Sequence, residues 1–340
     1  MLLVINAGSS SIKLAVFDAG LAEVARAQVA EIAQGGHAVA LTEGLQGAGV
    51  RWQDLTAAAH RVVHGGAGLT VPCRITAPVL AAIEDCVPLA PLHNPANLMG
   101  IRAVAALAPD LQQFASFDTA FHATNPQVAM RYAIPDGDAS LGIRRYGFHG
   151  LSYAALVQAL PGLSGAALPK RLLALHLGNG ASLCAILDGQ SVATTMGYSP
   201  LDGLTMGTRA GSIDGNAVLR MAQVHGIDGA ARILNHESGL LALGGASDMR
   251  GLHAAATPEA RFAVDHFCYW ATRHAGSMIS AMGGLDGIAF TGGIGENDAV
   301  VRARIIEGLA WAGAVPVHIV PAAEEREIAA EVLSLLNGGG

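Results

Sequence analysis

The apolar residues of this chain fall in short runs that end at polar or glycine-rich turns. The first run, residues 2–5, is continuously apolar, which is typical of a buried strand. Residues 6–11 predict a polar turn, and residues 12–17 predict a second strand. The same order of strand, polar turn and strand recurs at residues 172–177, 178–182 and 183–187. Two such openings, each followed by helices, predict two structurally related α/β halves.

The remaining apolar periodicities complete the predicted secondary structure. Further strands are expected at residues 60–64, 114–117, 190–194, 287–290 and 315–320. The strand at 190–194 follows Asp188-Gly189, a pair that is typical of a hairpin turn. Helices are expected at residues 78–86, 96–107, 216–225, 229–236, 258–282, 300–312 and 324–336. Because no low-complexity linker divides the chain, we expect two closely apposed domains with a cleft between them.

The composition narrows the class of protein. A length of 340 residues exceeds what one hydrophobic core usually holds, which favours two domains. A hydrophobic fraction of 51% with only 14% charged residues excludes a disordered chain. The net charge is −7 and the sequence shows no basic patch, so nucleic acid is not an expected partner.

Cysteine usage and hydropathy indicate the compartment. Cys73, Cys86, Cys184 and Cys268 have neither metal-ligand spacing nor the density of a disulfide framework, as expected of reduced thiols. The first apolar run lacks a cationic leader and is too short for a signal peptide. Polar or glycine-rich breaks interrupt the longer apolar stretches, so no membrane-spanning segment is expected. These features predict a cytoplasmic protein.

Three glycine-rich turns are candidates for binding phosphate. Residues 6–13 offer backbone N–H groups, the hydroxyls of Ser9 and Ser11, and the side chain of Lys13. The segment does not have the sequence of a Walker A loop. Residues 176–182 follow a predicted strand, and residues 291–297 lead into a helix, whose first N–H groups bind anions. The alternatives are a polar hairpin turn for the first segment and an Asn-Gly hairpin turn for the second.

Arginine and histidine side chains form a second group of candidates. Arg209 is flanked by small residues that leave room for a ligand, and arginine matches the oxygen geometry of carboxylates and phosphates. The other members of the group are Arg61, His93, His149 and His176. Each of these has a simpler alternative, which is a structural ion pair for an arginine or a hydrogen-bonded core position for a histidine.

A series of motifs occurs in an order that resembles the acetate kinase family, within the actin-like superfamily of sugar kinases and chaperone ATPases. The motifs are NAGSSSIK at 6–13, HRVVHGG at 60–66, PLHNP at 91–95, FDTAFH at 117–122, RRYGFHG at 144–150, HLGNG at 176–180, MGTR at 206–209, DMR at 248–250 and TGGIGEN at 291–297. Together they span nearly the whole chain.

This resemblance implies an α/β fold of two duplicated actin-like (ribonuclease H-like) domains, with mixed sheets flanked by helices and an interdomain cleft for the nucleotide. The first domain would comprise residues 1–121 and 322–340, and the second, residues 122–321, would also provide the surface of a homodimer. The implied activity is reversible, Mg²⁺- or Mn²⁺-dependent transfer of the ATP γ-phosphoryl group to acetate, which gives acetyl phosphate and ADP.

The same resemblance implies the site residues. Catalysis would involve Asp118, His149, Arg209 and Arg61, and the metal would be served by Asn6 and Glu324. The acid would be bound by Arg61, Val63, Leu92, Phe148 and Pro200. ATP would be bound by Lys13, Ser9, Ser11, His176, Leu177, Gly178, Asn179, Gly180, Asp248, Met249, Arg250, Gly292, Gly293, Ile294, Gly295, Glu296 and Asn297.

The chain departs from the family pattern at several places. It is shorter than family members before Arg61 and between Trp311 and Pro316, and one residue is missing before Asp248. Residues that differ from the usual ones are Leu151, Tyr153, Ala193, Ser212 and Gly215. None of these departures removes a named catalytic residue, but they affect the expected dimer surface and the adenine site.

Physical chemistry limits the mechanism that these residues can follow. A carboxylic acid substrate is already ionised at pH 7, so a general base is not needed to create the nucleophile. Cations that neutralise the approaching charges should dominate, and we therefore expect Asp118 to orient metal ligands or an arginine. The branched Val63 favours acetate over longer acids. The alternatives are a propionate, butyrate or other short-chain carboxylate kinase, a sugar kinase, and a non-catalytic actin-like nucleotide-binding module.

Overall fold

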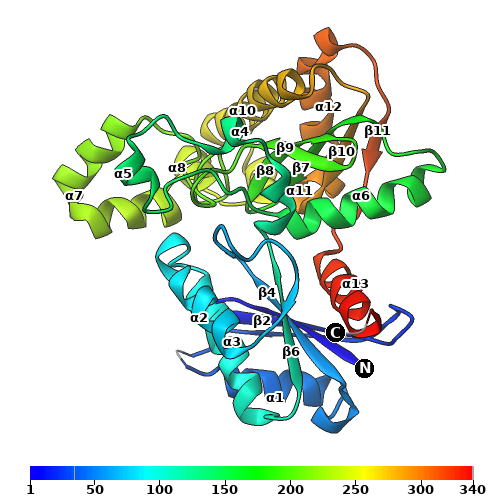
Figure 1. Cartoon of the computed structure of the whole chain (residues 1–340). Coiled ribbons are helices and arrows are strands. Elements are labelled where there is room, and N and C mark those ends of the chain that lie inside the picture. Colours follow the sequence, from blue (N-terminus) through cyan, green and yellow to red (C-terminus); the bar gives the residue numbers. More distant parts are fainter. Residues whose placement is uncertain (34, 339–340) are drawn as a thin grey trace. The chain divides into compact units, whose positions relative to one another are not determined.

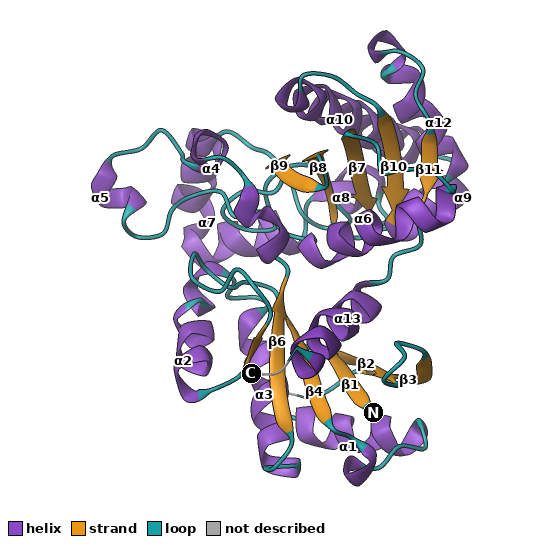
Figure 2. Ribbon diagram, turned by 45° about the vertical axis from the view of Figure 1, so that its right-hand side comes forward, coloured by secondary structure: helices purple, strands orange, loops and turns teal. Residues whose placement is uncertain are grey.

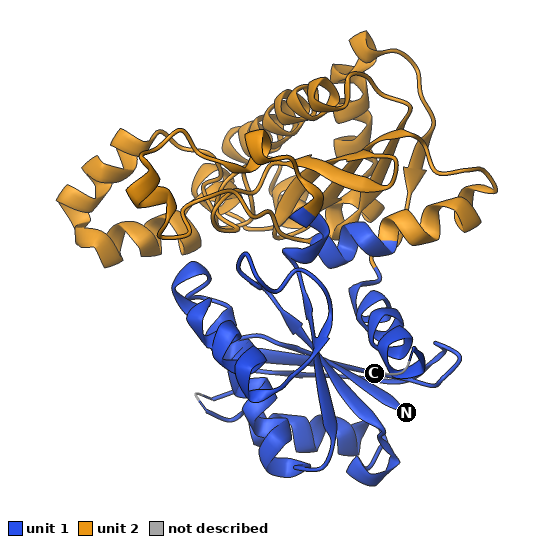
Figure 3. Ribbon diagram, viewed as in Figure 1, with its two compact units in different colours: residues 1–123, 150–155, 323–340 blue, residues 124–149, 156–322 orange. Residues whose placement is uncertain are grey.

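A computed structural model describes residues 1–33 and 35–338 of the chain (Figure 1). The chain forms two compact units, each assembled from separate stretches of sequence (Figure 3). The first unit comprises residues 1–123, 150–155 and 323–340, and the second comprises residues 124–149 and 156–322. Among the described residues, no helix combines the length and the apolar character that crossing a bilayer requires.

The first unit is built on a six-stranded mixed sheet with the strand order β3-β2-β1-β4-β6-β5. Its strands are β1 (Leu2–Ala7), β2 (Ser11–Phe17), β3 (Glu23–Ala30), β4 (Ala57–Val62), β5 (Cys73–Arg74) and β6 (Gln112–Phe117). The strands β1, β4 and β6 run parallel, while β2, β3 and β5 pair antiparallel with their neighbours. Its helices are α1 (His37–Gly47), α2 (Ala77–Asp85), α3 (Asn94–Leu107) and α13 (Glu324–Asn337), with 3₁₀ turns η1 (Trp52–Asp54), η2 (Val87–Leu89) and η3 (Ala120–Thr124).

Alternation along β1 explains why this sheet is covered on both faces. Leu3 and Ile5 belong to the hydrophobic cluster on the side of α1 and α3, while Leu2 and Val4 point to the opposite side. There they join the cluster that includes Ile328 of α13, and Figure 2 shows this helix lying against the sheet. A strand buried on both faces needs the continuous apolar run that the sequence shows.

The second unit repeats this plan with a five-stranded mixed sheet in the order β11-β10-β7-β8-β9. Its strands are β7 (Arg171–Leu177), β8 (Ala181–Leu187), β9 (Gln190–Thr194), β10 (Gly287–Thr291) and β11 (Val317–Ile319). In both units a three-stranded antiparallel meander is extended by parallel strands from its first strand. This agrees with the predicted mixed sheets of two related halves.

The helices of the second unit are α4 (Gln127–Met130), α5 (Asp136–Ala139), α7 (Gly215–His236), α8 (Gly239–Gly244), α9 (Met249–Ala255), α10 (Pro258–Met282), α11 (Gly292–Asn297) and α12 (Ala299–Gly308), followed by the 3₁₀ turn η4 (Ala310–Ala312). These helices lie partly against this sheet and partly away from it, as Figure 1 shows for α5 and α7. The long helix α10 packs against β7, β8 and β9. Helix α6 (Gly150–Ser164) is divided between the two units.

Most of the predicted elements are present, with differences at their ends. The predicted turn over residues 6–11 is shorter, because Asn6 and Ala7 still pair with β2. The two helices predicted at 216–225 and 229–236 form one helix, α7, which is kinked at Gly226. The strand predicted at 60–64 lies instead at Ala57–Val62. The sequence did not predict β3, β5, α1, α4, α5, α6, α8 or α9.

Candidate active site

Polar side chains of the first unit gather where its parallel strands end. Asn6 lies near the end of β1, Arg61 near the end of β4, and Asp118 directly after β6. Because β1, β4 and β6 are parallel neighbours, their carboxyl ends meet at one edge of the sheet, where ligands of open α/β folds bind. Lys13 lies opposite Asn6 in the register of β1 and β2, and its side chain is exposed.

Arg61 and Asp118 form a two-point ion pair at this edge. The Arg61 Nε donates to Asp118 Oδ1 at 2.9 Å, and Nη2 donates to Oδ2 at 2.7 Å. The remaining nitrogen, Nη1, makes only long contacts, at 3.4 Å to Asn6 Oδ1 and 3.4 Å to Glu324 Oε2. Three residues predicted as catalytic or metal-binding, Asp118, Asn6 and Glu324, are therefore within contact distance of the Arg61 guanidinium group.

Burial and charge oppose each other in this cluster. Burial raises the pKa of the Asp118 carboxyl, Arg61 counteracts this rise, and the Glu324 carboxylate adds to it. Burial alone would lower the pKa of Arg61, but Asp118 and Glu324 together raise it above its ordinary value. Arg61 therefore stays positively charged, and its position is determined by the carboxylates around it.

The second unit brings His149 and Arg209 to one point, the α-carbon of Gly180. A Cβ atom added to Gly180 would lie 2.8 Å from Arg209 Nη2 and 3.2 Å from His149 Nε2. Only glycine leaves this space free, because contacts below 3.0 Å force one of the groups to move. The tight turn between β7 and β8 thus exposes backbone beside two potential phosphate ligands.

His149 is held by its backbone and by two side chains. It has the left-handed backbone conformation (φ 59°) directly before α6, which is uncommon for a residue with a side chain. Its Nδ1 lies 2.9 Å from the hydroxyl of the buried Ser182, and its ring stacks on His176 at a centroid distance of 4.2 Å. These contacts leave Nε2 as the ring nitrogen that faces Gly180.

Arg209 differs from Arg61 because no carboxylate of the described chain forms an ion pair with it. Its Nη1 donates to the carbonyl oxygen of Pro200 at 2.6 Å. Burial lowers the pKa of Arg209 to about 10, so the group is still protonated at pH 7. A desolvated cation without a counter-charge is suited to receive an anionic ligand.

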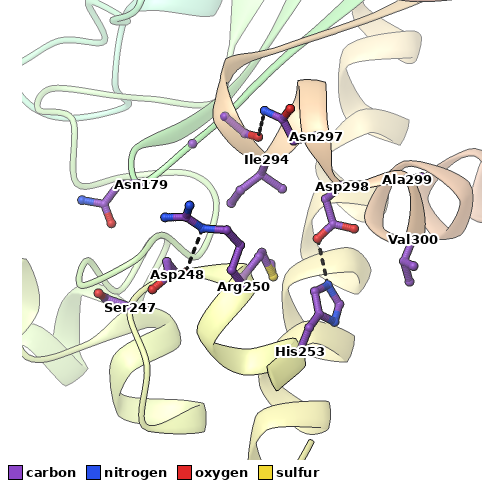
Figure 4. Close-up of a pocket in the computed structure, with 13 residues that line it drawn as sticks. Asn179, Ser247, Asp248, Arg250, His253, Ile294, Asn297, Asp298, Ala299 and Val300 are labelled. Atoms are coloured by element: carbon purple, nitrogen blue, oxygen red, sulfur yellow. Dashed lines mark hydrogen bonds and ion pairs between the residues drawn. The ribbon is translucent and has the colours of Figure 1, made fainter. Parts of the chain in front are cut away.

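A cavity of about 620 Å³ lies in the second unit at the ends of β7 and β10. It is lined by Gly178, Asn179, Ser247, Asp248, Met249, Arg250, His253, Gly293, Ile294, Asn297, Asp298, Ala299 and Val300. Figure 4 shows Arg250 extending into it between Asn179 and Ile294, while His253 contacts Asp298 at 2.8 Å. The volume and the mixed apolar and polar lining fit a small-molecule ligand of nucleotide size.

Eight of the residues predicted for ATP line this cavity, and the others lie elsewhere. The lining members are Gly178, Asn179, Asp248, Met249, Arg250, Gly293, Ile294 and Asn297. His176, Leu177, Gly180, Gly292, Gly295 and Glu296 belong to the same unit but do not line it, whereas Ser9, Ser11 and Lys13 belong to the first unit. Glu296 instead accepts hydrogen bonds from the backbone N–H groups of Gly292 and Ala322, each at 3.0 Å.

Sequence reasoning missed five residues that line the cavity: Ser247, His253, Asp298, Ala299 and Val300. Asp298 has a sequence signal, because an aspartate directly before an apolar-periodic segment is typical of a helix N-cap. Its side chain accepts a hydrogen bond from the N–H of Val301 and so caps α12. His253 has no such signal.

The residues predicted for the acid are divided between the units. Val63 and Leu92 belong to the first unit, and Phe148 and Pro200 belong to the second. Val63 is buried, and its N–H donates to Asn97 of α3 at 3.0 Å, whereas Leu92 is 46% exposed. Phe148 is fully buried beside His149 in the sequence.

The residues predicted for a metal offer oxygen atoms of the type that Mg²⁺ prefers. The Asn6 amide and the Glu324 carboxylate both lie 3.4 Å from Arg61 Nη1. Among residues 1–33 and 35–338, no group of three or more His, Cys, Asp or Glu side chains is arranged to hold a metal. A magnesium ion that arrives with a nucleotide needs only one or two protein ligands, so the donor set fits that kind of ion.

Comparison with known proteins gives one consistent result. The model of the acetokinase family matches residues 33–324. An acetate kinase of Nitrobacter hamburgensis is 44% identical over 303 residues, which cover 82% of this chain and 75% of that protein. The alignment with an acetate kinase of Streptomyces avermitilis extends over 363 residues at 40% identity, and it covers 98% of this chain and 89% of that protein.

Two solved structures are similar over nearly their whole length. The acetate kinase of Porphyromonas gingivalis has a TM-score of 0.90 and 31% identity, with 98% of this chain and 99% of that chain covered. A propionate kinase of Francisella tularensis has a TM-score of 0.90 and 32% identity, with 97% of this chain and 98% of that chain covered.

Proposed function

The chain belongs to the acetokinase family, and from this premise we propose that it transfers the γ-phosphoryl group of ATP to acetate, reversibly. The products are acetyl phosphate and ADP. The observation that carries the proposal is the pair of His149 Nε2 and Arg209 Nη2 at the backbone of Gly180, in the same unit as the nucleotide-sized cavity. A protein that only binds nucleotide would not need a half-buried cation without a counter-charge.

Arg209 and His149 stabilise the phosphoryl group during transfer. The transferring group spreads negative charge over its equatorial oxygens, and preorganised donors in a desolvated site stabilise that charge. Arg209 is already half-buried and held by the Pro200 carbonyl, so little reorganisation is needed. Acetate is the nucleophile, and the phosphoryl group passes to it directly, in line, without a covalent enzyme intermediate.

Arg61 binds the carboxylate of acetate through Nη1. Its other two nitrogens are occupied by Asp118, which supports the idea that Asp118 is an orienting residue rather than a base. The two 3.4 Å contacts of Nη1 are weak compared with the hydrogen bonds to Asp118, so this nitrogen can exchange them for a substrate oxygen. A carboxylate substrate is ionised at pH 7 and has no proton for a base to remove.

Asn6 and Glu324 would hold Mg²⁺, or Mn²⁺, brought by the nucleotide. When bound, the ion neutralises phosphate charge. Lys13, Ser9 and Ser11 supply a cation and hydroxyls for the phosphates, and the cavity around Asp248 and Ile294 receives the nucleoside. In this proposal Val63, Leu92, Phe148 and Pro200 surround the methyl group of the acid.

Propionate is the second candidate acid, because a propionate kinase is as similar in structure as an acetate kinase. One methylene group changes the free energy of transition-state binding by only ~1–3 kcal/mol in an apolar pocket, so some activity on propionate is expected. We favour acetate because the branched and buried Val63 narrows the space.

We further propose that the chain is a cytoplasmic homodimer, assembled through the domain formed by residues 122–321. Exposed apolar side chains of the second unit support this surface: Val128 is 91%, Ile227 80% and Leu141 70% exposed. A reducing compartment is supported by the cysteines, which form no disulfide among the described residues: Cys73, Cys86, Cys184 and Cys268. Light scattering at several concentrations tests the dimer, and a constant monomer mass would contradict it.

A hydroxylamine trap tests the proposed reaction. The protein is incubated with ATP and acetate, propionate or butyrate, with and without Mg²⁺, and acyl phosphate is detected as the hydroxamate. We expect Mg²⁺-dependent product with acetate at the highest kcat/KM. Hydroxamate that forms fastest from propionate would move the assignment to the second candidate acid.

A further inference from the structure

The position of Arg209 depends on a segment that has no regular secondary structure. Residues 195–203 follow β9 as an irregular loop, which we call the Pro200 loop. The carbonyl oxygen of Pro200 is the hydrogen-bond acceptor of the Arg209 guanidinium. Whatever fixes this loop therefore fixes the cation at Gly180.

Arg145 joins the two ends of the Pro200 loop. Its Nη1 lies 3.3 Å from the carbonyl oxygen of Thr195, 3.3 Å from that of Met196 and 3.2 Å from Asp202 Oδ2. The carboxylate of Asp202 is itself held, because its Oδ1 accepts the Ser212 hydroxyl at 2.7 Å. One guanidinium nitrogen thus ties the start of the loop to its end.

The middle of the loop is fixed by the segment that contains Arg145. The carbonyl of Gly197 accepts the N–H groups of Tyr146, at 3.0 Å, and Gly147, at 3.3 Å. The N–H of Tyr198 donates to the hydroxyl of Tyr132 at 3.0 Å, and the Tyr132 ring lies 5.4 Å from the Arg145 guanidinium carbon.

These groups leave no space at Gly197. A Cβ atom there would lie 2.6 Å from Asp202 Oδ2 and 3.3 Å from Arg145 Nη1. The loop is therefore closely packed against Arg145, Asp202 and Tyr132, which we call the clamp residues, although it lacks helix or strand hydrogen bonds of its own. Close packing makes its geometry sensitive to the loss of a single clamp residue.

The same segment also leads to the second phosphate ligand. Residues 145–147, which bind the loop, are followed directly by Phe148 and His149. The positions of His149 and Arg209 are therefore set by one local arrangement, with Arg145 at its centre.

We propose that Arg145 is a positioning residue for phosphoryl transfer, which acts through the Pro200 loop on Arg209. The proposal rests on the proposed function, because it assigns Arg145 to the same reaction. A displacement of about 1 Å in a group that positions reacting atoms can reduce a rate about 100-fold. Arg145 itself neither lines the nucleotide cavity nor contacts Gly180.

The test is the variant Arg145→Met compared with Arg171→Met. Arg171 is a matched control, since it also joins a carboxylate, Asp286, to a backbone carbonyl, that of Gly283, in the same unit. We expect Arg145→Met to lower kcat by about 10- to 100-fold with KM for ATP changed less than about twofold. Arg171→Met should lower the melting temperature without lowering kcat.

A double-mutant cycle separates positioning from a general structural role. If Arg145 acts through Arg209, Arg145→Met should lower kcat little or not at all when Arg209 is already alanine. Effects that multiply in the double variant would overturn the proposal, as would a normal kcat of Arg145→Met.

Two further measurements keep the proposal testable if Arg145→Met is poorly active or does not fold. Hydrogen exchange of residues 195–203 should speed up in Arg145→Met and stay unchanged in Arg171→Met; unchanged exchange in both would overturn the proposal. If Arg145→Met does not fold, Arg145→Lys keeps the charge beside Asp202 but loses the guanidinium geometry, and its kcat should still fall. A wild-type protein that makes no acyl phosphate would contradict the proposed function, whereas an active wild type with a normal Arg145 variant contradicts only this inference.

Discussion

Two arginines of this protein have opposite electrostatic surroundings. Arg61 lies among the oxygens of Asp118, Glu324 and Asn6, while Arg209 donates to a backbone carbonyl and has no carboxylate partner among the described residues. Surrounding carboxylates fix the first side chain in place and offset its charge. The second is half-buried and its charge is not offset by a carboxylate, so its interaction with an arriving anion is stronger than in bulk water.

Replacing Arg209 by alanine should therefore affect the chemical step more than binding. We expect kcat to fall by about 10²–10³-fold, as when one donor is removed from a preorganised anion site, with little change in KM for ATP. Arg209→Lys should recover little, because an ammonium cannot reach both the Pro200 carbonyl and a phosphate in the same geometry. Steady-state kinetics with varied ATP checks this, and near-normal kcat in Arg209→Ala would remove the residue from the transition state.

Asp118→Asn tests whether this carboxylate orients Arg61 or acts as a base. Loss of the two-point ion pair should raise KM for acetate and lower kcat, while the shape of the pH–rate profile is retained. Removing one partner of a buried ion pair should also destabilise the fold by about 3–5 kcal/mol. Loss of the low-pH limb, where a base would be protonated, with unchanged affinity for Mg²⁺, would instead identify Asp118 as a base.

His60 should make the stability of the protein depend on pH. Burial lowers the pKa of this residue to about 4, and its Nε2 lies 2.8 Å from Gln113 Oε1. Below pH 6.5 the unfolded chain binds a proton that the folded chain excludes, so the free energy of unfolding falls as pH decreases from 6.5 towards 4. The lowered pKa corresponds to about 3 kcal/mol over this range.

Urea unfolding at pH 7, 6, 5 and 4 measures this contribution. His60→Gln should make the pH dependence of the free energy of unfolding less steep, with part of it retained because burial also lowers the pKa of His64 to about 4. The matched control His225→Gln, at an exposed position of α7, should leave it as in the wild type. Equal slopes for all three proteins would contradict the assignment to His60.

Among the helices, two N-cap residues allow an effect on nucleotide binding to be separated from an effect on stability. Asp248 caps α9 by accepting the N–H of Gly251 and also lines the cavity. Asp214 caps α7 by accepting the N–H groups of Asn216 and Ala217, and it does not line the cavity. Each cap is expected to stabilise the protein by about 1 kcal/mol.

Asp248→Ala and Asp214→Ala should therefore lower stability by similar amounts but differ in nucleotide binding. Only Asp248→Ala should raise KM for ATP, because only this side chain faces the cavity. Thermal unfolding and ATP titration of the two variants check the comparison. An equal KM in both would place the nucleotide outside this cavity.

For the molecule as a whole, the sequence predicted most strands of the two sheets but not the exact ends of these strands. Continuous apolar runs such as Leu2 to Ile5 identify buried strands because both faces are covered by helices. The edge strand β3 alternates exposed and half-buried residues and lacks that signal. Asn6 was expected in a turn because polarity alone does not show that its backbone still pairs with Lys13.

The candidate site was predictable to a similar degree. Motifs with glycines and cations located Arg61, Asp118, His149 and Arg209. They did not show how these side chains are held, because contacts such as that of His149 with Ser182 join distant parts of the sequence. The clamp residue Arg145 stood in a motif without an assigned role. Only the three-dimensional contacts with Thr195 and Asp202 distinguish it from its neighbour Arg144.

Phosphorus NMR of the complete reaction tests the central claim most directly. The protein is mixed with ATP, Mg²⁺ and acetate, and the spectrum is recorded as the reaction proceeds. We expect an acyl phosphate resonance that grows together with those of ADP, and that nearly disappears when Arg209→Ala replaces the wild type. ADP accompanied only by inorganic phosphate, or no consumption of ATP in the presence of acetate, would contradict it.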